Sequence, residues 1–166
     1  KGYVIKEYFS NYNLHNSDII YKSDANEIQF INNNTEKLKI TLIDTGDSTM
    51  TGGRLLRVKE YLKSNETFLL TYGDGLSNID IKKLISFHNS QKKIATLSAV
   101  FPPARIGALE IDGNLVVEFK EKPRGDGALI NGGFFVLETE VFKYLKNDST
   151  IFEREPLNSL AKQKQL

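Results

Sequence analysis

One carboxylate lies between two glycines in a stretch that could bind a ligand. Residues 71–75 read TYGDG, so Asp74 follows directly on the apolar run TFLLTY at 67–72. Glycine lets a backbone approach a ligand closely, and a single exposed carboxylate suits a Mg²⁺ that keeps several waters and is completed by substrate phosphates. The pattern therefore indicates a metal ligand at Asp74, with an ordinary strand-to-helix turn as the alternative.

A second stretch, DTGDSTMTGGRL at 44–55, combines glycines and hydroxyls before a predicted helix. Backbone N–H groups at such a place can bind an anion or the edge of a base. Arg54 could make a bidentate contact to a phosphate or to a base carbonyl. The stretch matches neither GxxxxGK[ST] nor GxGxxG. The alternative is a flexible loop with Thr51 as the helix N-cap.

A third stretch, EFKEKP at 118–123, places two opposite charges before a proline. The proline restricts Lys122 to an extended backbone, and Glu121 and Lys122 then point to opposite faces. One could contact sugar hydroxyls while the other contacts a phosphate. Asn131, which precedes two glycines, could offer its amide to a sugar. The alternative is a solvated loop with an incidental charge pair.

Composition excludes several other classes of site and partner. The chain has 166 residues, a formal net charge of +1 and no cysteine. The charge argues against a nucleic-acid partner, and the lack of cysteine excludes disulfides and thiolate metal sites. No apolar run approaches the roughly 20 residues of a membrane span, so we expect no membrane partner. The lack of cysteine fits a cytoplasmic protein. Two separate histidines, His15 and His88, do not make a metal site, and His88 is predicted at the edge of the core.

The hydrophobic periodicity predicts alternating strands and helices, which favours an α/β fold with a parallel sheet covered by helices on both faces. A late hairpin around Asp112-Gly113-Asn114 and the run NGGFFVL would make this mainly parallel sheet mixed. The predicted helices are 4–12, 54–62, 81–88 and 138–145, and the predicted strands are 18–21, 27–31, 38–43, 67–72 (buried on both faces), 94–101, 108–111, 115–119 and 131–137.

Four stretches in this order resemble the bacterial glucose-1-phosphate cytidylyltransferases of the sugar nucleotidyltransferase family. They read TLIDTGDSTMTGGRL, FLLTYGDGLSNIDI, ATLSAVFPPARIGALEI and EFKEKPRGDGALINGGFFVL, and the similarity covers essentially the whole chain. TYGDG fits many members of the family, whereas DTGDSTMTGGR is similar to the cytidylyl branch. The resemblance implies a Rossmann-like nucleotidyltransferase fold. It also implies a Mg²⁺-dependent reaction in which CTP and α-D-glucose 1-phosphate give CDP-glucose and pyrophosphate.

The resemblance also implies roles for individual residues. Asp74 would be the catalytic Mg²⁺ ligand. The expected nucleotide-binding residues are Thr49, Gly52, Gly53, Arg54 and Gly73, and the expected sugar-phosphate-binding residues are Tyr72, Gly107, Glu121, Lys122 and Asn131.

The chain lacks two motifs that the family places upstream, a GGxGTR-type phosphate loop and a lysine after it, and a second metal-binding aspartate is expected downstream. We therefore expect residues 1–166 to be one partial domain that is inactive alone, in a protein that forms a homo-oligomer when intact. The competing interpretations are a non-catalytic sugar-nucleotide binding subunit, a nucleotidyltransferase for another nucleotide, a glycosyltransferase and a phosphate-accepting signalling domain. The glycosyltransferase is disfavoured because no DxD pair occurs at Asp74.

Overall fold

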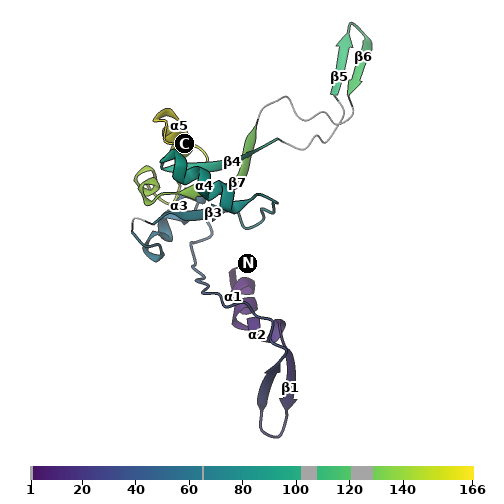
Figure 1. Ribbon diagram of the computed structural model, residues 1–166, viewed down its shortest axis with the longest axis vertical. Coiled ribbons are helices and arrows are strands. Elements are labelled where there is room, and N and C mark those ends of the chain that lie inside the picture. Colours follow the sequence, from purple (N-terminus) through teal and green to yellow (C-terminus); the bar gives the residue numbers. More distant parts are fainter. Residues whose placement is uncertain (1, 65, 102–107, 121–128) are drawn as a thin grey trace. The chain divides into compact units, whose positions relative to one another are not determined.

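The computed structural model describes residues 2–64, 66–101, 108–120 and 129–166, and at 108–111 and 118–120 it describes the backbone. The chain forms two compact units, Lys1–Gly46 and Asp47–Leu166, whose elements are labelled in Figure 1. The prediction of one partial domain is not tested by this division. Among the described helices, none has the length and apolar character that a bilayer crossing requires.

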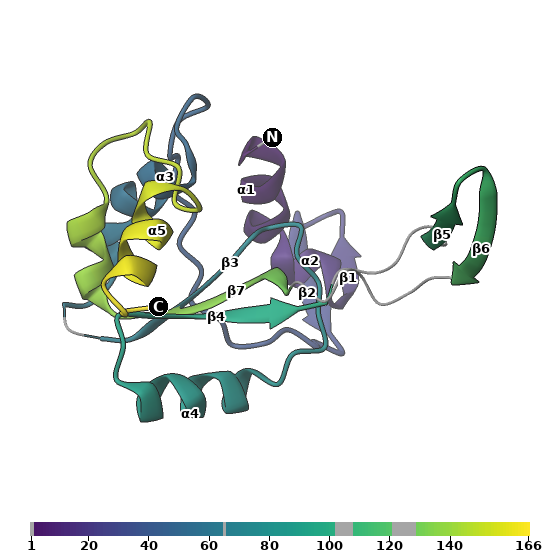
Figure 2. The same cartoon turned by 90° about the horizontal axis from the view of Figure 1, so that it is seen from above.

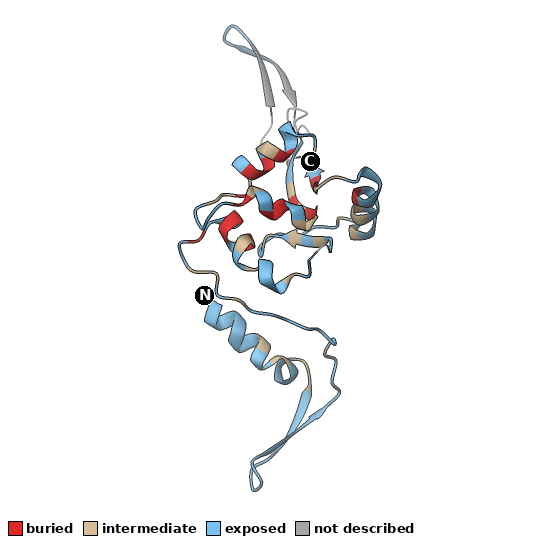
Figure 3. Ribbon diagram, turned by 90° about the vertical axis from the view of Figure 1, so that its left-hand side faces the viewer, coloured by how far each residue is buried: buried red, intermediate tan, exposed pale blue. Residues whose placement is uncertain are grey.

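The N-terminal unit contains the predicted first helix and the first two strands. The helix appears as α1 (Gly2–Ser10) followed by α2 (Tyr12–His15), and β1 (Asp18–Lys22) pairs antiparallel with β2 (Glu27–Ile31). Among the described residues 2–46 none is buried, and Figure 3 shows this unit exposed or intermediate throughout. The local patterns therefore form elements here without forming a core.

The predicted strand LKITLI at 38–43 is wrong. These residues belong to no strand and pair with no other described segment. A β-rich, apolar sequence favours an extended backbone, but a strand also needs a neighbour to accept and donate its ladder hydrogen bonds.

The C-terminal unit is built on a three-stranded sheet of order β3-β7-β4, formed by Phe68–Thr71, Ile130–Leu137 and Ala95–Val100. Both β3 and β4 pair antiparallel with β7, so β3 and β4 run in the same direction without being neighbours. The predicted mainly parallel arrangement is not confirmed, because every hydrogen-bonded pair among the described strands is antiparallel. Strand β7, which comes late in the chain, lies between β3 and β4, the two strands of a strand–helix–strand unit.

Helices lie on the two sides of this sheet. Figure 2 shows α4 (Ile81–Gln91) on one side and α3 (Thr51–Arg57) with α5 (Glu155–Lys162) on the other. Asp80 caps α4, because its Oδ1 accepts the Lys83 N–H at 3.0 Å. The helical spacing of four residues in the predicted helix 81–88 predicts that they share one face, and all four are buried or intermediate; they are Ile81, Leu84, Ile85 and His88.

The core packs α3, α5 and the 3-10 helix η2 (Thr139–Tyr144) onto β7. Leu55 of α3 is buried, and Val58 and Leu62, around the short helix η1 (Lys59–Tyr61), pack against the same cluster, as the helical spacing predicts. The buried members are Leu55, Ala95, Phe135, Leu137, Val141, Phe142, Leu145, Phe152, Leu157 and Leu160. These contacts hold α3 and the segment before α5 against one end of the sheet.

The strand β3 lies at the edge of the sheet, and the prediction that it is buried on both faces is wrong. Leu69 is 53% exposed, whereas its neighbours Phe68 and Leu70 are intermediate. An edge strand covered on one side has this alternation. The remaining strands, β5 (Ala108–Asp112) and β6 (Leu115–Lys120), form an antiparallel pair in which Asp112 lies opposite Leu115 and Gly113 has a φ of +58°.

Candidate functional site

Asp74 lies on a tight turn directly after β3. The Gly75 N–H donates to the Tyr72 carbonyl at 3.2 Å and closes the turn, and the Asp74 side chain is exposed. A Cβ added at Gly73 would meet no described atom within 4 Å. The turn therefore presents one carboxylate to solvent with open space beside it, as a ligand that approaches the backbone requires.

The described residues contain no group of three or more His, Cys, Asp or Glu side chains that could hold a metal ion. A complete protein cage is thus not formed by this part of the chain. One exposed carboxylate nevertheless fits a Mg²⁺ ion, since this ion usually takes one or two carboxylates and fills its other positions with waters and phosphate oxygens. The metal role of Asp74 stays a prediction.

Tyr72, two residues before Asp74, has a half-buried side chain with a fixed hydroxyl. Its hydroxyl donates to Glu153 Oε1 at 2.5 Å, and its ring meets Phe135 edge-on with centroids 6.0 Å apart. Burial, together with the hydrogen bond and the negative charge of Glu153, raises the pKa of Tyr72 to about 12. The phenol is therefore protonated at neutral pH and acts as a donor toward Glu153.

Glu153 also holds the start of α3. Its second oxygen, Oε2, accepts the Thr51 hydroxyl at 2.6 Å, and Thr51 Oγ1 in turn accepts the Phe152 N–H at 2.9 Å. Thr51 is the first residue of α3, and Met50 is the N-cap, so the prediction of Thr51 as the N-cap is wrong. The Thr51 hydroxyl contacts the segment before α5 instead.

Asn131 approaches the same place from β7. Its Nδ2 lies 3.5 Å from the Tyr72 hydroxyl, and its Oδ1 accepts the Gly133 N–H at 2.8 Å. The register between β4 and β7 shifts between Leu97 and Ala99, and Gly133 has a φ of +79°. A Cβ on Gly133 would come within 3.0 Å of the Tyr72 ring, so this position favours glycine. The shift in register places Asn131 beside Tyr72.

We call Thr51, Tyr72, Asn131 and Glu153 the Glu153 cluster. It joins the stretches DTGDSTMTGGRL, TYGDG and NGG, which are predicted separately from the sequence. Glu153 itself is the member that the sequence pattern does not reveal. It lies in the run EREP beside Glu155, which pairs with Lys146 at 2.6 Å instead, and no spacing distinguishes the two glutamates.

Gly52 and Gly53 have a packing role that the sequence analysis does not anticipate. Their N–H groups both donate to the Thr150 carbonyl, at 2.9 and 3.2 Å. A Cβ on Gly53 would lie 2.5 Å from the Asp148 carbonyl oxygen. The two glycines let α3 approach residues 148–150 closely, and their N–H groups are occupied there, so the predicted nucleotide contact receives no support from these donors.

The other predicted residues of the stretch DTGDSTMTGGRL differ in exposure. Thr49 is buried at 7% exposure, whereas Arg54 is exposed and its Nη2 donates to the Asp47 carbonyl at 3.2 Å. The next arginine, Arg57, makes a bidentate pair with Asp148 at 2.9 and 2.5 Å. This hydrogen-bonded pair holds the pKa of Asp148 below its usual value. Gly107, Glu121 and Lys122 lie outside the described residues.

A second carboxylate cluster lies on the other side of the sheet. His88 is 1% exposed, with Nδ1 2.8 Å from Thr96 Oγ1 and Nε2 2.9 Å from Glu138 Oε1. Glu138 also accepts the Thr67 hydroxyl at 2.8 Å. We call these four residues the Glu138 cluster. His88 is thus more deeply buried than the predicted edge position.

Burial by itself raises the pKa of Glu138, but the hydrogen bonds from His88 and Thr67 and the interaction with the His88 charge outweigh it, so the pKa lies below its usual value. The carboxylate form of Glu138 is therefore favoured in the folded protein.

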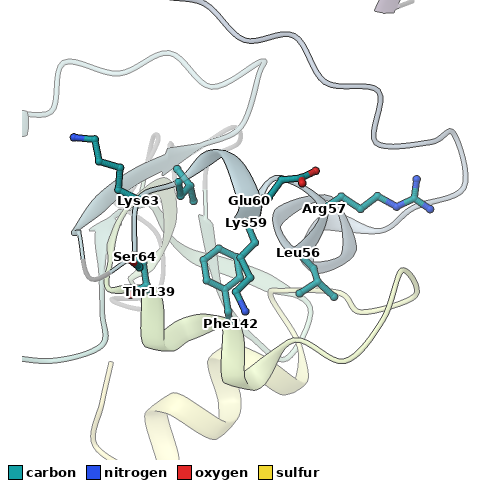
Figure 4. Close-up of a pocket in the computed structure, with 9 residues that line it drawn as sticks. Leu56, Arg57, Lys59, Glu60, Lys63, Ser64, Thr139 and Phe142 are labelled. Carbon is teal, nitrogen blue, oxygen red and sulfur yellow. The ribbon is translucent and has the colours of Figure 1, made fainter.

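A pocket of about 550 Å³ opens beside α3, η1 and η2. Figure 4 shows the side chains that line it, Arg57, Lys59, Lys63 and Phe142 among them, and the Lys59 ammonium lies 5.5 Å from the centre of the Phe142 ring. None of its lining residues is a predicted site residue or a member of the Glu153 cluster. The pocket is therefore separate from the site built around Tyr72.

Comparisons with known proteins bear on what such a site does. A family model described as "Nucleotidyl transferase" matches residues 19–162. The chain is 55% identical over its whole length to a glucose-1-phosphate cytidylyltransferase of Salmonella typhi and 44% identical to a probable glucose-1-phosphate cytidylyltransferase of Bacillus subtilis. It spans 65% of the length of each of these relatives.

A solved structure, HddC from Yersinia pseudotuberculosis, is 26% identical with a TM-score of 0.45, over 64% of this chain and 48% of that one. This structural similarity is too low to argue the fold from.

Proposed function

The chain belongs to the nucleotidyl transferase family, and from that premise we propose that the full-length protein transfers a cytidylyl group from CTP to α-D-glucose 1-phosphate. The products are CDP-glucose and pyrophosphate. The observation that supports this choice most strongly is the 55% identity, over the whole chain, to a relative named for this activity. The matched residues include the stretches that meet at the Glu153 cluster.

In the proposed reaction an oxygen of the sugar phosphate attacks the α-phosphorus of CTP while the bond to pyrophosphate breaks. Little covalent chemistry is required of the protein, so catalysis depends on positioning and on balancing negative charge. Mg²⁺ held by Asp74 would supply charge neutralisation on the phosphates. The exposed position of Asp74, beside the open backbone of Gly73, supports this assignment.

We assign the nucleotide to the side of the site formed by the loop before α3. Arg54, in the helix α3 that directly follows this loop, is an exposed cation and suits a phosphate or a base carbonyl. Thr49 is buried, so we propose that it shapes the loop as well as lining the nucleotide. Tyr72 and Asn131 remain our proposed sugar-phosphate residues on this part of the chain, together with the predicted Gly107, Glu121 and Lys122.

We further propose that the full-length protein has a Rossmann-like sheet. Support comes from the β3–α4–β4 unit, whose two strands run in the same direction and are connected by a helix that lies against the sheet. The predicted homo-oligomer and the predicted cytoplasmic location stay predictions.

The test is pyrophosphate release by the full-length protein with glucose 1-phosphate, Mg²⁺ and each of CTP, UTP, dTTP and ATP in turn. We expect release with CTP alone. Release with a different nucleotide would contradict the choice of base while keeping nucleotidyl transfer. A folded protein that releases no pyrophosphate with any of the four would contradict the proposal and favour a non-catalytic sugar-nucleotide binding subunit.

A further inference from the structure

We propose that Glu153 is a positioning residue of the candidate site, which fixes the start of α3 relative to the turn that bears Asp74. The proposal rests on the proposed function for its kinetic consequences and on the geometry of the Glu153 cluster for its structural ones. In this role Glu153 contacts neither substrate. It acts through the two hydroxyl groups that it holds.

The two oxygens of Glu153 accept hydrogen bonds from two segments that are distant in the sequence. Oε1 accepts from Tyr72 at 2.5 Å and Oε2 accepts from Thr51 at 2.6 Å. Bonds from hydroxyls to a carboxylate at this length are charge-assisted and stronger than bonds between neutral groups. One side chain therefore connects the start of α3 to the turn after β3.

The negative charge of Glu153 defines which group donates and which accepts in each hydrogen bond of the cluster. A carboxylate can only accept, so the hydroxyls of Tyr72 and Thr51 must both donate to Glu153. The Tyr72 oxygen is left to accept from the Asn131 amide at 3.5 Å. The Thr51 oxygen is left to accept the Phe152 N–H at 2.9 Å. An anion at position 153 thus sets the orientation of both hydroxyls, which a neutral amide would not do.

The two hydroxyls lie close in the chain to predicted site residues. Thr51 lies between Thr49 and Arg54, the predicted nucleotide-binding residues, and Tyr72 lies two residues before Asp74. The distance between Thr51 and Tyr72 therefore affects the distance between the predicted nucleotide-binding residues and the predicted metal ligand. Because in-line transfer depends on such spacing, loosening it lowers the rate without removing a reacting group.

The kinetic test is a double-mutant cycle in the full-length protein. Glu153→Gln keeps the size of the side chain and removes the anion. We expect it to lower kcat/KM for CTP roughly tenfold, as the loss of one charge-assisted hydrogen bond would. In a Tyr72→Phe, Thr51→Val background the same change is expected to cost less than about twofold, because Glu153 has no hydroxyl left to hold.

The matched control is Glu138→Gln, which alters a carboxylate with a similar set of partners in the other cluster. We expect its kcat/KM to stay within about twofold of the parent at a temperature where both proteins are folded. A tenfold loss from Glu153→Gln in both backgrounds would overturn the proposal, because Glu153 would then act on substrate directly.

Amide hydrogen exchange of the full-length protein tests the positioning without any activity. Glu153→Gln should speed exchange several-fold at residues 50–57 and 71–76 and leave β4 unchanged. Faster exchange confined to 150–160, or spread over the whole chain, would overturn the proposal. If the parent releases no pyrophosphate with any nucleotide, the proposed function fails, while the exchange pattern still decides the role of Glu153.

Discussion

The Glu153 and Glu138 clusters use the same chemistry in different surroundings. Each is built on one glutamate that accepts hydrogen bonds from two other segments of the chain. In the Glu138 cluster the central partner, His88, is 1% exposed and both ring nitrogens have protein partners. In the Glu153 cluster the partners lie at a strand end and a helix start, beside the exposed Asp74.

We infer from this difference that the two clusters have different roles. The Glu138 cluster joins α4 to the sheet, and we expect it to contribute to stability. The Glu153 cluster connects three stretches that are predicted to bind substrates, and it leaves an exposed carboxylate and an open glycine beside it. Four predictions sharpen this contrast between a stabilising cluster and a positioning one.

The largest effect is expected on the functional side, at Asp74. Asp74→Asn in the full-length protein should lower kcat about a thousandfold, since metal-based charge stabilisation supplies several kcal/mol. The thermal unfolding midpoint should not move by more than a degree or two, because the side chain is exposed. Near-normal turnover of this variant would show that Asp74 is not the metal ligand.

The next largest effect is expected on the stabilising side, at His88. His88→Ala should lower the free energy of unfolding by about 3 kcal/mol, because it opens a cavity and leaves Glu138 and Thr96 without their shared partner. Urea denaturation measures this loss. The neighbouring exposed residue gives a control, and Asn89→Ala should change the free energy by less than about 0.5 kcal/mol. Equal effects of the two changes would refute a stabilising role for the cluster.

A smaller loss of stability is expected where α3 approaches residues 148–150. Gly53→Ala places a Cβ 2.5 Å from the Asp148 carbonyl oxygen, and such overpacking costs about 2 kcal/mol. Gly73→Ala is the control, because a Cβ there meets no described atom within 4 Å. Thermal or urea unfolding of the two variants compares them. If Gly53→Ala is as stable as Gly73→Ala, the close approach of α3 is not required.

The smallest effect is a pH dependence of the Glu138 cluster. The folded-state pKa of Glu138 lies below its usual value of 4.5, so its ionised form is favoured by folding. This contribution is present above about pH 4.5 and is lost as the pH falls through the folded-state pKa. The difference in unfolding free energy between the parent and Glu138→Gln should therefore shrink from pH 7 to pH 3. A difference that stays constant would show that the carboxylate charge contributes nothing.

Much of the local structure follows from the sequence, because periodicity reports which face of an element is buried. The stripe of α4 from Ile81 to His88 is an example, and the glycine-flanked Asp74 does lie on an exposed turn. Periodicity does not reveal which residues that are distant in the chain contact one another. The insertion of β7 between β3 and β4, the lack of a described strand partner for residues 38–43 and the occupied N–H groups of Gly52 and Gly53 all depend on such partners.

Glu153 shows the same limit at the candidate site. Its neighbours Arg154 and Glu155 are equally polar, and no pattern within EREP distinguishes the residue that contacts Thr51 and Tyr72. A carboxylate that bridges two segments is recognised only after the segments have been placed. The sequence predicts the stretches that we expect to bind substrate, but not the side chain that connects them.

The measurement that tests the account most directly compares Glu153→Gln with Glu138→Gln in the full-length protein, by their kcat/KM for CTP at a temperature where both are folded. The account predicts a roughly tenfold loss for Glu153→Gln and less than about a twofold loss for Glu138→Gln. Equal losses, or a larger loss for Glu138→Gln, would contradict the assignment of one cluster to the site and the other to the fold.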